Sequence, residues 1–177
     1  MKKIFITMLF IWATSMGAQV IIGDAAGTAP ANKKQSVLLE FANSGDKGII
    51  LPYVRTLPAN PAPGTILLDS TVLTSAKVKL YNGSSWVVLS GDSDISSSLV
   101  NQPATADGIN AKAIIGSTTS AADGVLVLES TTKAMVLPTV TNIENIVNPS
   151  PGMMVYVKGS KKYLAFFDGS KWAFWIP

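Results

Sequence analysis

Few side chains in this sequence have the chemistry for catalysis. Its 177 residues include no Cys and no His, which excludes a thiolate zinc site, a Cys nucleophile and a Ser-His-Asp triad. Among the eleven acidic residues, only Glu40 and Glu129 are predicted to recur at equivalent positions of a repeat, each after an apolar run. A glycosidase needs two carboxyl groups converging in a cleft, so we interpret each as a residue that leaves a strand toward solvent.

Two further groupings resemble reactive sites without completing one. Ser160-Lys161 pairs a hydroxyl with an amine, but adjacent residues in a turn direct their side chains apart. Asp92, Asp94 and Ser96 have the spacing of the first three oxygen ligands of a calcium-binding loop. The sixth position is Ser97 rather than Gly and the twelfth is Pro103 rather than Glu, so the loop is incomplete. We therefore predict no enzyme, no catalytic residues, no cofactor and no metal site.

The sequence motifs that would form the framework of a functional site occur twice in the chain. Ile-Ile-Leu-Pro, Asn-Pro-Ala-Pro-Gly and Leu-Tyr-Asn-Gly-Ser-Ser-Trp in residues 49–86 are followed by Met-Val-Leu-Pro, Asn-Pro-Ser-Pro-Gly and Phe-Phe-Asp-Gly-Ser-Lys-Trp in residues 135–172. Leu51, Pro52 and Trp86 each return 86 residues later, whereas the Asn-Pro block returns after 88. A constant offset with a small adjustment in a loop is typical of a duplicated unit.

Short apolar runs bounded by turn residues predict strands throughout. Runs at 37–41 and 125–129, rich in Val and Leu, favour strands buried on both faces, and a further strand in each copy ends at Pro52 or Pro138. Three more strands close each copy as a meander, at residues 65–68, 78–81 and 86–89 and again at 153–157, 163–167 and 172–176.

The last hairpin of each copy is predicted to have a four-residue loop. Tyr81 then faces Trp86, and Phe167 faces Trp172, which places an aromatic pair at the same site in both copies. Thr141-Asn142-Ile143-Glu144 has the spacing of a capping box and predicts a short helical turn. The corresponding segment at 56–59 is shorter and contains a Pro, so its helix should be weaker or absent.

These patterns predict an all-β fold made of two tandem homologous small β-meander units, with a short helical turn in the second. Residues 1–18 are predicted to be a signal peptide, with a cationic start, an apolar run and a small-residue cleavage site. Residues 19–91 form the first repeat unit, 92–112 a solvated linker with a turn of helix near 95–100, and 113–177 the second unit.

Loss of the signal peptide removes Lys2 and Lys3 and leaves a net charge of about +1, which gives no electrostatic basis for nucleic-acid binding. No other run is long enough to span a membrane. We therefore expect an exported protein that is extracellular or on the cell surface, with the periplasm as the alternative. Charged residues make up 14% of the chain, against about 25% in ordinary soluble domains, which suits a protein that buries surface against neighbours.

The order of these motifs resembles a repeated module of exported Bacteroidetes proteins, some of which look like phage tail-fibre or surface-fibre proteins. The second copy has the fuller match, with Glu-Ser-Thr-Thr-Lys at 129–133, whereas the first copy departs from the pattern at 41–46. The resemblance covers most of the chain after residue 18. It implies a surface or fibre context and transfers no catalytic residue.

Two functions from different classes fit the sequence. The first is a structural or assembly module that works through self-association or contact with another surface protein. The alternative is an adhesin that stacks glycans on exposed aromatic rings. Either use predicts an interaction surface among five aromatic residues: Trp175, Tyr163, Trp172, Trp86 and Tyr81. In the last strand, Trp172 should face the core of its own unit, and Trp175 should meet the first copy or a neighbouring subunit.

Overall fold

The computed structural model describes residues 19–42, 45–102, 105, 108 and 111–176, so the predicted signal peptide lies outside the described residues. The fold is all-β, with short strands joined by loops and single 3-10 turns. No helix in these ranges is long and apolar enough to cross a membrane. The division into two tandem units stays a prediction, although the strands of the two sequence copies can be compared one by one.

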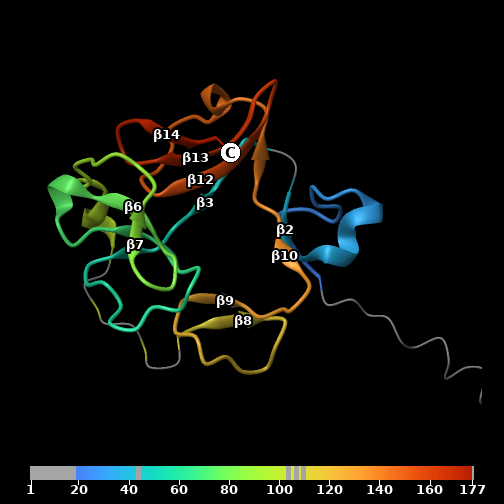
Figure 1. Ribbon diagram of the computed structural model, residues 1–177. Coiled ribbons are helices and arrows are strands. Elements are labelled where there is room, and N and C mark those ends of the chain that lie inside the picture. Colours follow the sequence, from blue (N-terminus) through green and yellow to red (C-terminus); the bar gives the residue numbers. More distant parts are fainter. Residues whose placement is uncertain (1–18, 43–44, 103–104, 106–107, 109–110, 177) are drawn as a thin grey trace, which may run out of the picture.

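A four-stranded and a five-stranded sheet form the larger part of the molecule (Figure 1). The first contains β4 (Tyr53–Val54), β5 (Ile66–Asp69), β6 (Lys77–Tyr81) and β7 (Trp86–Val88). The second contains, in this order, β11 (Thr139–Val140), β12 (Met153–Lys158), β13 (Lys162–Phe167) and β14 (Trp172–Trp175). Its fifth strand is β3 (Ile49–Ile50), which pairs with β12. In both, the first pair of strands is parallel and the next two pairs are antiparallel. The predicted three-stranded meanders are present, and sequence reasoning missed only the short parallel strand that follows each Leu-Pro.

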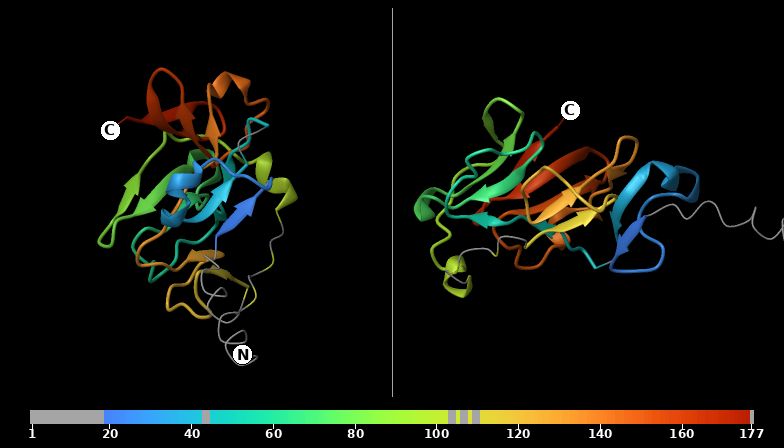
Figure 2. Two further views of the ribbon diagram at one scale, coloured as in Figure 1. Left: turned by 90° about the vertical axis from the view of Figure 1, so that its right-hand side faces the viewer. Right: turned by 90° about the horizontal axis from the view of Figure 1, so that it is seen from below.

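A smaller sheet lies to one side of these two (Figures 1 and 2). It has β2 (Val37–Phe41) at its centre, with β1 (Val20–Ile22) and β10 (Ala134–Met135) on either edge, all parallel. A separate two-stranded parallel sheet pairs β8 (Ala113–Ile115) with β9 (Leu126–Leu128).

Two short strands connect the copies of the sequence motif. β3 (Ile49–Ile50), from the first copy, pairs antiparallel with β12 of the second. β10, from the second copy, pairs with β2 of the first. The two copies therefore complete each other's sheets.

The main core lies between these two larger sheets. Leu68 and Val78 of the first sheet share one buried cluster with Met154 and Phe166 of the second. The opposite face of the second sheet packs Val155, Val157 and Ala165 against Val140 and Ile146. This alternation of side chains along β12 and β13 lets one sheet contribute to two cores.

The predicted solvated linker is wrong for its first part. Ile95 is 1% exposed and Leu99 is 6% exposed, and both belong to the core between the sheets. The segment is held by a pair of backbone hydrogen bonds between Ala76 and Ser93. A 3-10 turn, η3 (Ser98–Asn101), follows where helix was predicted, and part of the remaining segment lies outside the described residues.

The predicted helical turn of the second copy is η4 (Ile143–Asn145). Its cap is Asn142, whose side chain accepts from the Glu144 N–H at 3.1 Å, rather than Thr141 as the capping-box spacing suggested. Residues 56–59 of the first copy form no helix, as predicted. Two further 3-10 helices were not predicted, η1 (Ala31–Ser36) and η2 (Leu73–Ser75).

Candidate self-association surface

The two aromatic hairpins have nearly identical geometry. Tyr81 is paired with Trp86 across β6 and β7, with ring centroids 5.3 Å apart at 54°. Phe167 is paired with Trp172 across β13 and β14, also at 5.3 Å and at 51°. Both predicted pairs and the four-residue loops between them are confirmed. All four rings are half-buried, so each pair mainly stabilises its hairpin.

Side-chain caps explain why the loops adopt this shape. The Asp168 carboxylate accepts hydrogen bonds from the N–H groups of Ser170 and Lys171 at 2.8 and 2.9 Å. The Asn82 side chain does the same for the two corresponding residues of its own loop. Gly169 has φ +118°, a conformation that a residue with a side chain rarely adopts.

The end of the second sheet exposes an unusually apolar segment. Phe174 is 49% exposed, Trp175 57% and Ile176 65%. β14 pairs with β13 on one side, and no strand of the described part pairs with its other edge. An apolar strand with an open edge is a surface that another chain can cover.

The five predicted aromatic residues do not form one cluster. Trp172 packs in the core of its own sheet together with Tyr163, and the Tyr163 ring contacts Phe174 edge-on at 5.2 Å. Trp175 lies opposite Leu164, whose side chain packs on the core between the two sheets. No ring contact in the described ranges joins Trp175 to the other aromatic residues. Tyr81 and Trp86 belong to the first sheet.

A second exposed apolar edge was missed. The run at 125–129 was predicted to be buried on both faces, but Val125 is 60% exposed and Leu126 is 47% exposed. The similar run in β2 is buried as predicted from Val37 to Leu39. Composition alone could not separate them, because the difference lies in the neighbouring strand β10, which covers β2.

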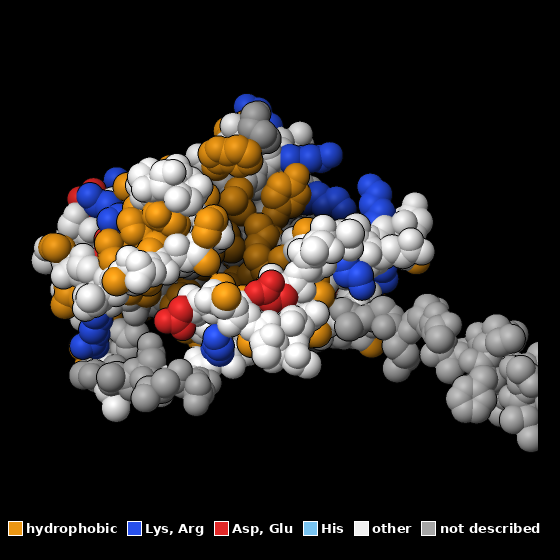
Figure 3. Space-filling model, turned by 60° about the horizontal axis from the view of Figure 1, so that its bottom comes forward, with side chains coloured by type: hydrophobic (Ala, Val, Ile, Leu, Met, Phe, Trp, Pro, Cys, Tyr) orange, Lys and Arg blue, Asp and Glu red, His pale blue; other side chains and the backbone are white. Residues whose placement is uncertain are grey.

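A space-filling view shows where apolar side chains gather. Figure 3 shows them lining a hollow on the face seen there, with acidic side chains at its margin and basic ones around the outside. The absence of a large single-sign patch on this face agrees with the small net charge of the chain, +3 over 177 residues. It favours apolar contact with another protein over electrostatic recognition.

Glu40 is a structural residue, and its predicted position toward solvent is wrong. Its side chain is fully buried and accepts hydrogen bonds from Lys34 Nζ at 2.8 Å and from the Ala29 N–H at 2.7 Å. The Gln19 amide donates a third bond to it. Burial alone would raise the pKa of Glu40, but these bonds and the Lys34 charge outweigh it and lower the pKa. The carboxylate thereby fixes the loop between β1 and β2.

Glu129 has a different environment from Glu40. It is half-buried and accepts a hydrogen bond from the Ser120 hydroxyl. Its N–H donates to Ile115, the bond that Ala42 makes to Ile22 in the first copy. Glu129 is therefore the structural counterpart of Ala42, and the predicted equivalence of the two glutamates is wrong by two residues.

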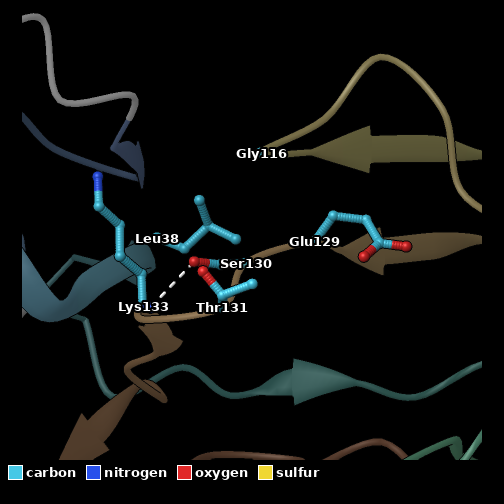
Figure 4. Close-up of a pocket in the computed structure, with 6 residues that line it drawn as sticks. All are labelled: Leu38, Gly116, Glu129, Ser130, Thr131 and Lys133. Atoms are coloured by element: carbon cyan, nitrogen blue, oxygen red, sulfur yellow. Dashed lines mark hydrogen bonds between the residues drawn. The ribbon is translucent and has the colours of Figure 1, made fainter.

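The hollow beside Glu129 does not assemble a reactive site. It is lined by Leu38, Gly116, Glu129, Ser130, Thr131 and Lys133. Figure 4 shows the Lys133 amine and the Glu129 carboxylate pointing away from each other. The Ser130 hydroxyl accepts a hydrogen bond from the Lys133 N–H at 2.9 Å and so caps the turn before β10. Among the described residues, no group of three acidic side chains is placed to hold a metal ion.

Comparison with known proteins gives one family match, to part of the chain. Residues 114–176 match the family described as a phage tail like trimerisation region. The match spans β8 to β14 and includes both exposed apolar edges. No curated protein and no solved structure matches the chain. A trimerisation region is a structural module that acts through protein contacts, and this fits an assembly role better than catalysis.

Proposed function

We propose that this protein is an exported structural module that trimerises as part of a cell-surface or extracellular fibre. The observation that carries the proposal is the exposed apolar end of β14, at Phe174, Trp175 and Ile176, within the segment that matches a trimerisation region. Burial of these side chains against another subunit removes apolar area from water, the main favourable term in protein association.

The sparse charge of the chain supports the same proposal. Charged groups are depleted at the cores of subunit interfaces, where aromatic residues are enriched. Export is supported by the signal-peptide pattern of residues 1–18, and a fibre context by the order of the repeated motifs. Immunoblotting of fractionated cells tests the location, and recovery of the protein only in the cytoplasm would overturn it.

The oligomeric state provides the direct test. Residues 19–177 should be purified and measured by size-exclusion chromatography with light scattering and by sedimentation over a wide concentration range. We expect a species of three times the chain mass that dissociates on dilution. A strictly monomeric protein at every concentration, with no partner recovered by cross-linking on cells, would overturn the proposal.

A glycan-binding adhesin is the alternative from another class. Trp175 supports it, because its ring is more than half exposed. The rings of Trp86 and Trp172 support it less, since each tilts against a neighbouring ring. A glycan array is the discriminating measurement: binding that Trp175→Ser abolishes would favour the adhesin, and no binding to any sugar would exclude it.

A further inference from the structure

The parallel pairs β1–β2 and β8–β9 are built alike. In both pairs a glycine with positive φ follows the first strand, Gly23 at +106° and Gly116 at +99°. A side chain at either would collide with the second strand, because its Cβ would lie 2.7 Å from the Ala42 Cβ or 2.1 Å from the Glu129 carbonyl oxygen. These contacts align Ala42 with Glu129, and so align Leu39 of β2 with Leu126 of β9.

The far edge of β2 is occupied. The Leu39 carbonyl accepts a hydrogen bond from the Val136 N–H at 2.8 Å, and β10 runs parallel to β2 along this edge. Leu39 is consequently 0% exposed. The strand that covers it is the one that ends in the Leu-Pro of the second copy.

The same edge of β9 is open. The Val125 carbonyl and the Glu129 N–H both bond to β8. Backbone groups alternate between the two edges of a strand within a parallel sheet, so those of Leu126 face away from β8. No described strand pairs there, and Leu126 is 47% exposed where Leu39 is fully buried.

The first sequence copy contains the counterpart of the covering strand β10. This is β3, which is paired on one edge only. β3 precedes the first Leu-Pro, and its Ile50 corresponds to Val136 in the repeat. The neighbouring Leu51 N–H donates to Gly152, beside β12. The Ile50 backbone therefore faces the other edge of β3, where no described strand pairs, and its side chain is 52% exposed.

We propose that a second copy of this chain docks its β3 onto β9, in parallel, with the Ile50 N–H donating to the Leu126 carbonyl. The contact repeats the one that β10 makes on β2 within the chain. It rests on the proposed self-association and states how that occurs. Because the two edges are different surfaces, the contact is head-to-tail, and repetition closes a ring or extends a fibre.

Cysteine cross-linking tests the contact directly, since the chain has no Cys. In this register Leu126 lies opposite Ile49, as Leu39 lies opposite Met135 within the chain. One chain carrying Leu126→Cys should therefore be mixed with another carrying Ile49→Cys and oxidised mildly. We expect a disulfide-linked pair containing one chain of each kind, formed at least ten times faster than with Val147→Cys in place of Ile49→Cys, a control position that is 83% exposed and lies between η4 and β12.

A proline variant tests the hydrogen bonds of the edge. Leu126→Pro removes the N–H that faces the open edge, and edge strands tolerate proline there. We expect its self-association to weaken at least tenfold, while Leu126→Val, which keeps the N–H, behaves as wild type. Thermal melting of the dissociated chains shows whether the proline variant is folded. If it is not folded, the cysteine experiment alone tests whether β3 docks on β9.

The outcomes separate the two proposals. A wild-type chain that stays monomeric overturns both self-association and this contact. A wild-type chain that associates while its cysteine variants give no cross-link between positions 126 and 49 overturns the docking of β3 alone. Cross-linking of Leu126→Cys with Met135→Cys, and none with Ile49→Cys, would show that β10 of the second copy occupies this edge, and this result also overturns the docking of β3.

Discussion

The hydroxyl of Tyr53 donates a hydrogen bond of 2.7 Å to the carbonyl oxygen of Pro151. Tyr53 begins β4 in the first copy, and Pro151 belongs to the Asn-Pro-Ser-Pro-Gly turn of the second. At the next residue, a Cβ on Gly152 would lie only 3.2 Å from Leu68 of the first sheet. The turn thus joins the two sheets as well as reversing the chain.

Tyr53→Phe should destabilise the fold by about 1–2 kcal/mol, because it leaves the carbonyl of the buried Pro151 without its donor. Burial raises the pKa of the Tyr53 phenol. Its contribution is therefore complete below the ordinary pKa of about 10 and is lost as the pH rises through the higher folded value. Urea unfolding of both proteins should show a difference that shrinks at high pH; an unchanged midpoint at neutral pH would contradict the prediction.

Glu40→Gln should lower the stability by about 2 kcal/mol, since charge-assisted bonds to a buried carboxylate are replaced by weaker ones. The lowered pKa of Glu40 means that its contribution is present above the ordinary glutamate value and is lost as the pH falls through the folded value. Acid unfolding should be less steep in the variant. Glu129→Gln is the matched control, and an equal loss from both would contradict the structural role of Glu40.

Ile95→Ala should destabilise the protein by about 2–4 kcal/mol, because it leaves a cavity between the two sheets. Val100→Ala, at a position that is 81% exposed, should change stability by less than about 0.5 kcal/mol. Denaturant unfolding of the two variants distinguishes a segment that belongs to the core from a solvated linker. Two small and equal effects would restore the linker interpretation.

Trp175→Ser should leave the melting temperature of the dissociated chain nearly unchanged and weaken self-association, because the ring is 57% exposed in the single chain. Trp172→Ser should instead destabilise the chain by about 2 kcal/mol through loss of packing against Phe167 and the adjacent core. Melting curves with sedimentation of the same samples separate these effects. Collapse of the fold in Trp175→Ser would make this residue part of the core.

Truncation after Ser170 should unfold the second sheet. It removes β14 and with it Trp172, whose ring packs on Phe167. Far-ultraviolet circular dichroism and proteolysis should both report the loss. A truncated chain that melts cooperatively at the wild-type temperature would show that the last hairpin contributes little.

The strands and hairpins could be predicted because their determinants are local. Alternating apolar residues and an Asn-Gly or Asp-Gly turn are sufficient to pair Tyr81 with Trp86 and Phe167 with Trp172. The short strands after Pro52 and Pro138 could not be predicted, because two residues carry no periodicity. Their pairing depends on where the longer strands β5 and β12 lie.

The surface was less predictable because burial is decided by remote neighbours. Val-Leu runs in β2 and β9 look alike, but only β2 is covered by β10. Ile95 stands among polar residues, and nothing near it in the sequence indicates that it packs between the sheets. Trp175 was identified as a candidate because its ring is absent from the first copy, where Leu89 packs on the core.

The exchange of β3 and β10 between the copies has a consequence for the order in which the chain can fold. Leu39 in β2 is covered only when residues 134–136 have been synthesised and have paired with it. Leu68 likewise packs against Phe166, which lies near the other end of the sequence. The first half therefore cannot complete its sheets or its core during synthesis, and most of the fold has to form after the last hairpin has emerged. Contacts so distant in sequence make folding slow, so the chain stays unfolded for longer after synthesis, which is compatible with the proposed export.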